Sequence, residues 1–192
     1  MKYLRRAAAF LAKKAVLYTL ILSLLTYTFY MAFNLSNAYI VVSEGLEERV
    51  RVTLTRTGST ALKNYFSDEF VNVDIRLSKS RNGTDEYRFF DISSFEYDVK
   101  VSNLRWHPLR THNVIDADGK IVQTYHGVIT CTITETVSNI SGSLKREYAT
   151  DENKHEIEHW NSGRYDVTLG KVNGSWRVVS MVQDLNFRDP ES

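Results

Sequence analysis

The sequence predicts an α+β protein with a single N-terminal transmembrane helix followed by one domain built on an antiparallel sheet. Three observations lead to this prediction. Residues 15–33 form an apolar run of nineteen residues without a charge, residues 43–66 carry apolar side chains at helical spacing, and much of the chain from residue 70 onward alternates apolar with polar residues. One or two helices packed on a curved antiparallel sheet of roughly four to six strands would bury the apolar side chains of the helical segment and of the alternating strands.

The apolar run is long enough to cross a lipid bilayer. Nineteen helical residues cover about 28 Å, close to the ~30 Å hydrocarbon core. No acid precedes the run, and the basic residues before it are Lys2, Arg5, Arg6, Lys13 and Lys14. After the run, no basic residue appears until Arg49. Because basic flanks stay on the cytoplasmic side, we expect residues 1–14 on the cytoplasmic side of the cell membrane and the C-terminal domain on the opposite side.

Two alternatives concern this N-terminal part. Ser36-Asn37-Ala38 loosely resembles a signal-peptide cleavage site. The apolar run exceeds the usual 7–15 residues of a signal peptide, so we expect an uncleaved anchor. We expect the basic residues before the span to act only as its charged flank. The alternative is that they belong to a short helix that lies on anionic lipid.

Composition excludes several classes of function. Beyond Ala38, 19 basic residues against 23 acids give a net charge of −4, which argues against a nucleic-acid partner. The single cysteine, Cys131, rules out an intramolecular disulfide, and its place in a strand pattern favours a small buried hydrophobe. No nucleophile elbow, P-loop or dinucleotide fingerprint is present, so we expect neither cofactor nor enzyme activity.

The first elements after the anchor are predicted to be helical. Residues 34–42 should extend the membrane helix or kink just past it, and Ser43 can cap a new helix that ends near Gly58. The alternation from Val50 to Thr55 leaves a strand as the alternative. A second short helix is expected from Ser59. The apolar positions of the two helices are Leu46, Val50 and Leu54, then Leu62, Tyr65 and Phe66.

Strands are predicted from residue 70 onward. Residues 70–77 alternate as a half-buried strand, Asn82-Gly83 is a turn signal, and residues 95–106 form the next strand, which should stop at Pro108. Residues 116–120 (DADGK) carry turn chemistry. The longest strand follows at 121–136, with threonines on one face and, on the apolar face, Ile121, Tyr125, Ile129, Cys131 and Ile133.

The last part is a loop and a hairpin. Residues 138–162 read as a long polar loop with a helical turn around 151–160. Strands from Tyr165 and from Trp176 should be joined by a tight turn at Asn173-Gly174. Residues 188–192 form a polar tail.

The segment His155-Glu156-Ile157-Glu158-His159 matches the zinc metalloprotease pattern H-E-x-x-H. On a helix the two histidines could share Zn²⁺, with Glu156 as general base. The pattern lies in the most polar part of the chain, and no third ligand stands out at a characteristic spacing. We expect a solvated, charged segment, with a zinc hydrolase using His155 and His159 as an alternative.

A second candidate site is a cleft or contact surface on the concave face of the sheet. Its candidate residues are Tyr125, His126 and Trp176. Core packing and cross-strand pairs are the alternative role of such aromatic residues.

The order of elements resembles a known family. A basic N-terminus and one span precede helices ending in residues 62–70 (LKNYFSDEF), and the last hairpin reads YDVTLG at 165–170 and NGSWRVVSM at 173–181. This is similar to the NTF2-like (cystatin-like) fold over about residues 43–187, and to the bitopic assembly factors of type IV secretion and conjugation machines. The resemblance implies a scaffold that dimerises and docks other envelope proteins without cofactor or catalysis; it identifies no partner-binding residue.

The sequence therefore predicts a non-enzymatic, membrane-anchored scaffold subunit of a bacterial envelope complex. Its expected partners are membrane lipid, other envelope proteins and further copies of the chain. The main alternative is an extracytoplasmic ligand-binding or sensory domain that uses the concave sheet face.

Overall fold

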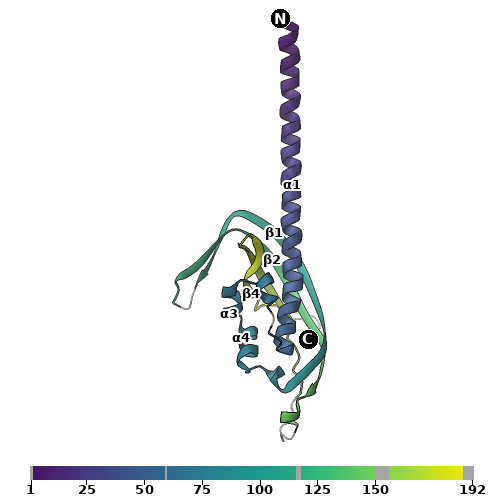
Figure 1. Cartoon of the computed structure of the whole chain (residues 1–192), viewed down its shortest axis with the longest axis vertical. Helices are drawn as coiled ribbons and strands as arrows, with labels where there is room; N and C mark the ends of the chain where they lie inside the picture. Colours follow the sequence, from purple (N-terminus) through teal and green to yellow (C-terminus); the bar gives the residue numbers. More distant parts are fainter. Residues whose placement is uncertain (1, 59, 116–117, 150–155, 188–192) are drawn as a thin grey trace. The chain divides into compact units, whose positions relative to one another are not determined.

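The computed structural model describes residues 2–58, 60–115, 118–149 and 156–187 (Figure 1). A long N-terminal helix is followed by short helices and a four-stranded antiparallel sheet, which confirms the α+β prediction. The chain divides into two compact units, Met1–Ser36 and Asn37–Ser192.

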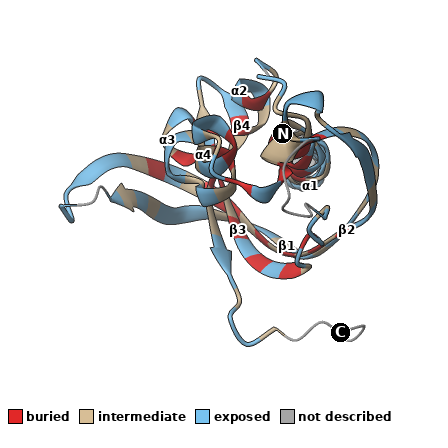
Figure 2. Cartoon of the chain, turned by 90° about the horizontal axis from the view of Figure 1, so that it is seen from below, coloured by how far each residue is buried: buried red, intermediate tan, exposed pale blue. Residues whose placement is uncertain are grey.

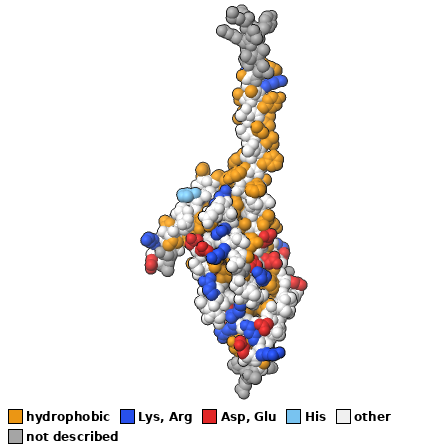
Figure 3. Space-filling view, viewed as in Figure 1, with side chains coloured by type: hydrophobic (Ala, Val, Ile, Leu, Met, Phe, Trp, Pro, Cys, Tyr) orange, Lys and Arg blue, Asp and Glu red, His pale blue; other side chains and the backbone are white. Residues whose placement is uncertain are grey.

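The helix α1 (Lys2–Thr55) supplies all the described residues of the first unit. From Ala12 onward it is long and apolar enough to cross a membrane, a property that signal sequences near an N-terminus share. Residues 12–30 are all exposed, and Figure 3 shows hydrophobic side chains along this part. The hydroxyls of Thr19, Thr26 and Thr28 donate to the carbonyl four residues earlier, so these polar groups are satisfied within the helix.

The last part of α1 belongs to the core of the second unit. Leu46, Val50 and Leu54 are 0%, 0% and 1% exposed, so the prediction of a helix rather than a strand is confirmed. The predicted helix start at Ser43 is wrong. Ser43 lies inside α1, and its hydroxyl donates to the carbonyls of Tyr39 and Ile40. A cap is needed only where the preceding turn is missing, and here that turn is present.

The predicted strand at 70–77 is wrong, because this segment is helical. After α2 (Leu62–Tyr65) come α3 (Asp68–Val73) and α4 (Ile75–Asn82). The side chain of Ser67 accepts the Phe70 N–H and that of Asp74 accepts the Leu77 N–H, so each helix has an N-cap. The apolar alternation is coincidental: Val73 and Ile75 are 69% and 70% exposed. Gly83, with φ of 66°, closes α4, as the turn signal there indicated.

The sheet has the order β1-β2-β3-β4, with every neighbouring pair antiparallel. Its strands are β1 (Phe90–Ile115), β2 (Ile121–Leu144), β3 (Gly163–Val172) and β4 (Ser175–Gln183). The 3₁₀ turns η1 (Glu86–Phe89) and η2 (Arg146–Tyr148) flank the long pair β1 and β2. Figure 2 shows the buried residues concentrated on the sheet and the helices beside it.

Two strands are longer than predicted. β1 continues through Pro108, which falls in a register shift between His107 and Thr111, where the missing N–H breaks no regular ladder. β2 extends to Leu144, so the predicted loop at 138–162 is wrong in its first part. Residues 138–144 are mostly exposed and pair only with β1, which explains their polar composition.

The apolar face of β2 is confirmed from Tyr125 onward, with Tyr125, Ile129, Cys131 and Ile133 buried, whereas Ile121 is 52% exposed. Burial, followed by the nearby charge of Asp166, raises the pKa of the Cys131 thiol to about 12. The final hairpin is also confirmed. Asn173 and Gly174 have φ of 51° and 84°, as a type I′ turn between β3 and β4 requires.

Replacing Leu54 by Ala in the full-length chain is expected to lower the free energy of unfolding by about 2–5 kcal/mol, because a cavity remains in the core. The matched control, Val73→Ala, should change it by less than about 0.5 kcal/mol, because Val73 is exposed. Tryptophan fluorescence in urea measures both, since all three tryptophans lie in the second unit. Equal losses from both substitutions would contradict the helical assignment of residues 68–82.

Candidate functional site

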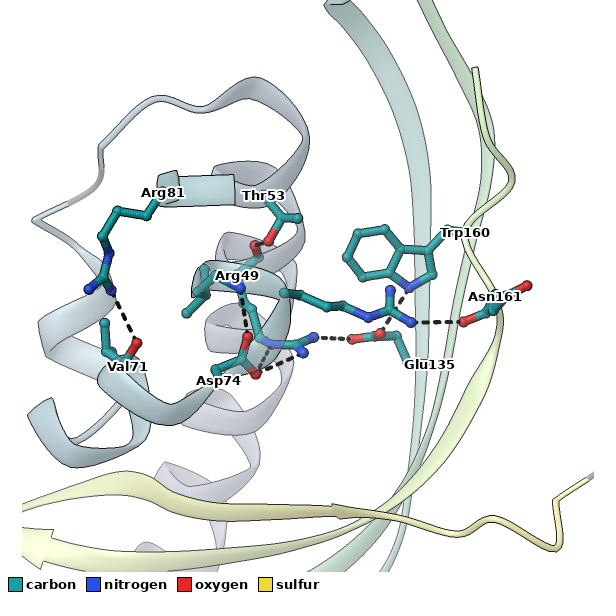
Figure 4. Close-up of polar contacts among 10 residues, drawn as sticks. Arg49, Thr53, Val71, Asp74, Arg81, Glu135, Trp160 and Asn161 are labelled. Atoms are coloured by element: carbon teal, nitrogen blue, oxygen red, sulfur yellow. Dashed lines mark hydrogen bonds and ion pairs between the residues drawn. The ribbon is translucent and has the colours of Figure 1, made fainter. Parts of the chain in front are cut away.

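The centre of the second unit holds a buried arginine, Arg49 of α1, which is 3% exposed. Its Nε and Nη2 atoms donate to Asp74 Oδ2 at 3.0 and 2.9 Å (Figure 4). Its Nη1 atom lies 3.5 Å from Glu135 Oε2. One guanidinium therefore connects α1, the start of α4 and strand β2.

Both carboxylates have a second task. Asp74 uses its other oxygen, Oδ1, to accept the Leu77 N–H at 2.8 Å and so caps α4. Glu135 is fully buried, and its Oε1 accepts a hydrogen bond from Trp160 Nε1 at 3.1 Å. The network thus fixes α4 and residue 160 against β2.

The charge of Arg49 is stabilised in place. Burial alone would lower the pKa of Arg49, but attraction to Asp74 and then to Glu135 outweighs it, so the pKa is raised above its ordinary value. Burial also raises the pKa of Tyr97 and of Tyr165, and the nearby Glu135 adds to this effect in both. The guanidinium and the two phenols therefore keep their protons at neutral pH, so none of the three can act as a base there.

A cavity of about 600 Å³ opens beside this network. α3, α4, the end of β1 and the strands β3 and β4 form its walls, and Arg49 reaches it from α1. The lining side chains are Arg49, Phe70, Val73, Asp74, Ile75, Arg76, Lys79, His112, Asn113, Val114, Ile115, Tyr165, Val179, Ser180, Met181 and Gln183.

The charged groups of the cavity are mainly basic. The guanidinium of Arg76 lies 3.8 Å from the ring centre of Trp160 and donates to the Asn161 carbonyl at 3.3 Å. Lys79 is exposed at the same wall. Burial and the neighbouring Arg110 lower the pKa of His112, so its imidazole is neutral at neutral pH. An apolar wall with two basic groups suits an amphipathic anion.

The structure does not bring the predicted cleft residues together at this cavity. Tyr125 is 5% exposed and its hydroxyl donates to Glu69 at 3.2 Å; Trp176 is also 5% exposed, with Lys171 Nζ 5.1 Å from its ring centre. His126 is exposed. None of the three predicted residues lines the cavity.

The H-E-x-x-H segment is only partly described. His155 lies outside the described residues, while Glu156 and His159 are exposed in irregular backbone. The predicted helical turn at 151–160 is therefore absent from its described part, 156–160, where Trp160 is held by the buried Glu135 instead. Among residues 2–58, 60–115, 118–149 and 156–187, no three histidine, cysteine or acidic side chains converge as a metal site.

Sequence reasoning missed the buried network. A usable signal exists for one member, since Glu135 continues the apolar series of Ile129, Cys131 and Ile133 at two-residue spacing. An acid at such a position is buried and needs a partner. Nothing local identifies that partner, because Arg49 lies on a different element far along the chain.

Comparisons of the chain with protein-family models, with curated proteins and with solved structures found no match.

Replacing Arg49 by Met should lower the free energy of unfolding by about 3–5 kcal/mol, because it leaves two buried carboxylates without their cation. The double variant Arg49→Met/Glu135→Gln should lose less than the sum of the two single variants, since the charges interact. Denaturant titration of the full-length chain measures all three.

Arg51→Met is the matched control for Arg49→Met. Arg51 pairs with Glu48 at 2.6 Å, but its side chain is 46% exposed, so we expect a loss of at most about 1 kcal/mol. A control loss as large as that of Arg49→Met, or strict additivity in the double variant, would show that the buried network does not stabilise the domain.

Proposed function

We propose that this chain is a non-enzymatic, single-pass membrane-anchored scaffold subunit of a bacterial envelope complex of the type IV secretion or conjugation kind. Its basic N-terminus lies in the cytoplasm, and its sheet domain lies outside the membrane. The observation that carries this proposal is the exposed apolar part of α1, which needs a lipid environment and leads in the same helix to a folded domain.

The likeness in element order to NTF2-like assembly factors supplies the kind of complex. The features of this chain on which the likeness rests are the long apolar N-terminal helix, the short helices and the antiparallel sheet. The basic residues before the span and their absence up to Arg49 supply the orientation.

A surface suited to protein contacts lies on the β1–β2 ribbon, which we define as residues 107–115 and 121–128. Where these residues have a strand partner it lies within the ribbon, because the pairing of β2 with β3 begins only at Ile129. The ribbon therefore extends beyond the four-stranded part of the sheet (Figure 1). Leu109, Ile121 and Val122 on it are 96%, 52% and 50% exposed, and such apolar side chains are candidates for burial against another protein.

Photo-crosslinking in intact cells tests the proposal. A photoreactive amino acid at position 109 is expected to give discrete adducts with other envelope proteins, because Leu109 is almost fully exposed on the ribbon. The matched control is position 185, since Leu185 is 86% exposed but lies after β4 and away from the ribbon in sequence. Protease added to spheroplasts should digest the domain.

Two results would overturn the scaffold proposal. One is a domain that external protease cannot reach, which would place it in the cytoplasm. The other is a position 109 that yields no adduct beyond those given by position 185.

A second candidate is a ligand-binding or sensory domain, favoured by the cavity of about 600 Å³. The probe is the amphipathic anion 1-anilinonaphthalene-8-sulfonate. Lys79→Glu is expected to weaken its binding at least tenfold, about 1.4 kcal/mol, because a cationic wall becomes anionic. Filling the cavity with Met181→Trp should have the same effect.

Lys63→Glu on α2 is the matched control, because Lys63 is exposed and does not line the cavity. Equal probe affinity of the unmodified chain and the Lys79→Glu variant would remove this second candidate.

A further inference from the structure

The outer edge of β1 is free of any partner strand among the described residues. β1 stands first in the sheet order, with β2 on its other side. Along this edge, Glu96 to Ser102 pair with β2 in regular register, from Ser138 to Thr132. Register shifts between Ser94 and Glu96 and between Ser102 and Arg105 end the regular run on both sides. The unpaired N–H and C=O groups of such a run can pair with another strand.

The side chains along this run alternate strictly. Tyr97, Val99 and Val101 are half-buried and lie on the face toward the core, whereas the exposed face carries Glu96, Asp98, Lys100 and Ser102. Val99 is the middle residue of the run, with three regularly paired residues on each side.

We propose that this edge pairs antiparallel with the same edge of a second copy of the chain, about a two-fold axis through Val99. Pairing in this register places Asp98 of each copy opposite Lys100 of the other, so two opposite-charge cross-strand pairs form. The two seven-residue runs then match end to end, and the flanking irregularities fall outside the paired segment.

Neighbouring registers are disfavoured by charge. An axis through Asp98 or through Lys100 sets that residue opposite its own copy, and like charges directly opposite destabilise a strand pair. An axis through Tyr97 sets Asp98 opposite Glu96, with the same effect. An axis through Val101 extends the pairing into the irregular segment after Ser102. The charges and the bulges therefore select one register.

The contact is short and is assisted by anchoring. A cross-strand charge pair contributes little by itself, so two such pairs alone stabilise a dimer only weakly. Two copies anchored in one membrane have a raised effective concentration, which favours such a contact. The inference deepens the proposed scaffold role and rests on its membrane anchor, while it uses a different surface from the β1–β2 ribbon.

Site-specific disulfide formation tests the register in the full-length chain in membranes. With the buried native thiol removed by Cys131→Ala, the substitution Val99→Cys should give a disulfide-linked dimer on mild oxidation. Opposed residues of antiparallel strands have Cα atoms about 4.5–5.5 Å apart, within the range that a disulfide spans.

The matched control is Val101→Cys in the same background, a half-buried valine on the same face. In the proposed register the two copies of residue 101 are four residues out of step, about 13 Å apart, and cannot be bridged. We therefore expect at least a tenfold lower dimer yield from Val101→Cys than from Val99→Cys.

Charge exchange provides a second measurement that does not depend on the cysteine. Asp98→Lys should lower the dimer fraction in native mass spectrometry from detergent at least several-fold, because lysines then face each other. Adding Lys100→Asp to the same chain should restore it, since opposite charges face again.

Equal disulfide yields at positions 99 and 101 would overturn the inference. So would the absence of a disulfide at both positions in chains whose unfolding midpoint is unchanged. A double charge variant that remains monomeric would also overturn it. The scaffold proposal is judged separately, because cross-links from position 109 on the ribbon do not depend on the β1 edge.

Discussion

The buried charge of Arg49 is the constraint on which the second unit depends. A guanidinium cannot be removed from water without partners, and here Asp74 and Glu135 supply them. Asp74 does so from the N-cap of α4, and Glu135 does so from the buried face of β2. One ion network therefore sets where α4 lies relative to α1 and the sheet, and the cavity lies beside it.

The parts of the fold that sequence predicts are those set by local patterns. Leu46, Val50 and Leu54 repeat at helical spacing and are buried, and Asn173-Gly174 adopts the turn its chemistry favours. The segment at 70–77 misleads, because two N-caps, Ser67 and Asp74, outweigh a chance alternation of apolar residues. The Arg49 network could not be derived, since its pairing joins residues distant in sequence on α1, α4 and β2. For the cavity, the sequence predicts only that one face of the sheet is concave. The residues predicted to lie there, Tyr125, His126 and Trp176, do not line the cavity.

The surfaces of the second unit differ in what they can bind. The cavity has an apolar wall with Arg76 and Lys79, which suits a small amphipathic anion. The β1–β2 ribbon exposes apolar side chains, of which Leu109 and Val122 fall in register shifts of the pair. The regular run of β1 instead has an outer backbone edge with no partner strand in the described part of the chain, beside alternating charges. The two surfaces that we propose for protein contacts therefore lie on separate segments of β1.

Amide hydrogen exchange of the full-length chain in a bilayer tests the central claim most directly. If Arg49 joins α1 to the sheet, the amides of Leu46 to Leu54 and those of Ile129 to Val137 should open with one common free energy, that of global unfolding. The same amides should lose protection together when Arg49 is replaced by Met. Rapid exchange in the helix segment while the strand stays protected would contradict the account.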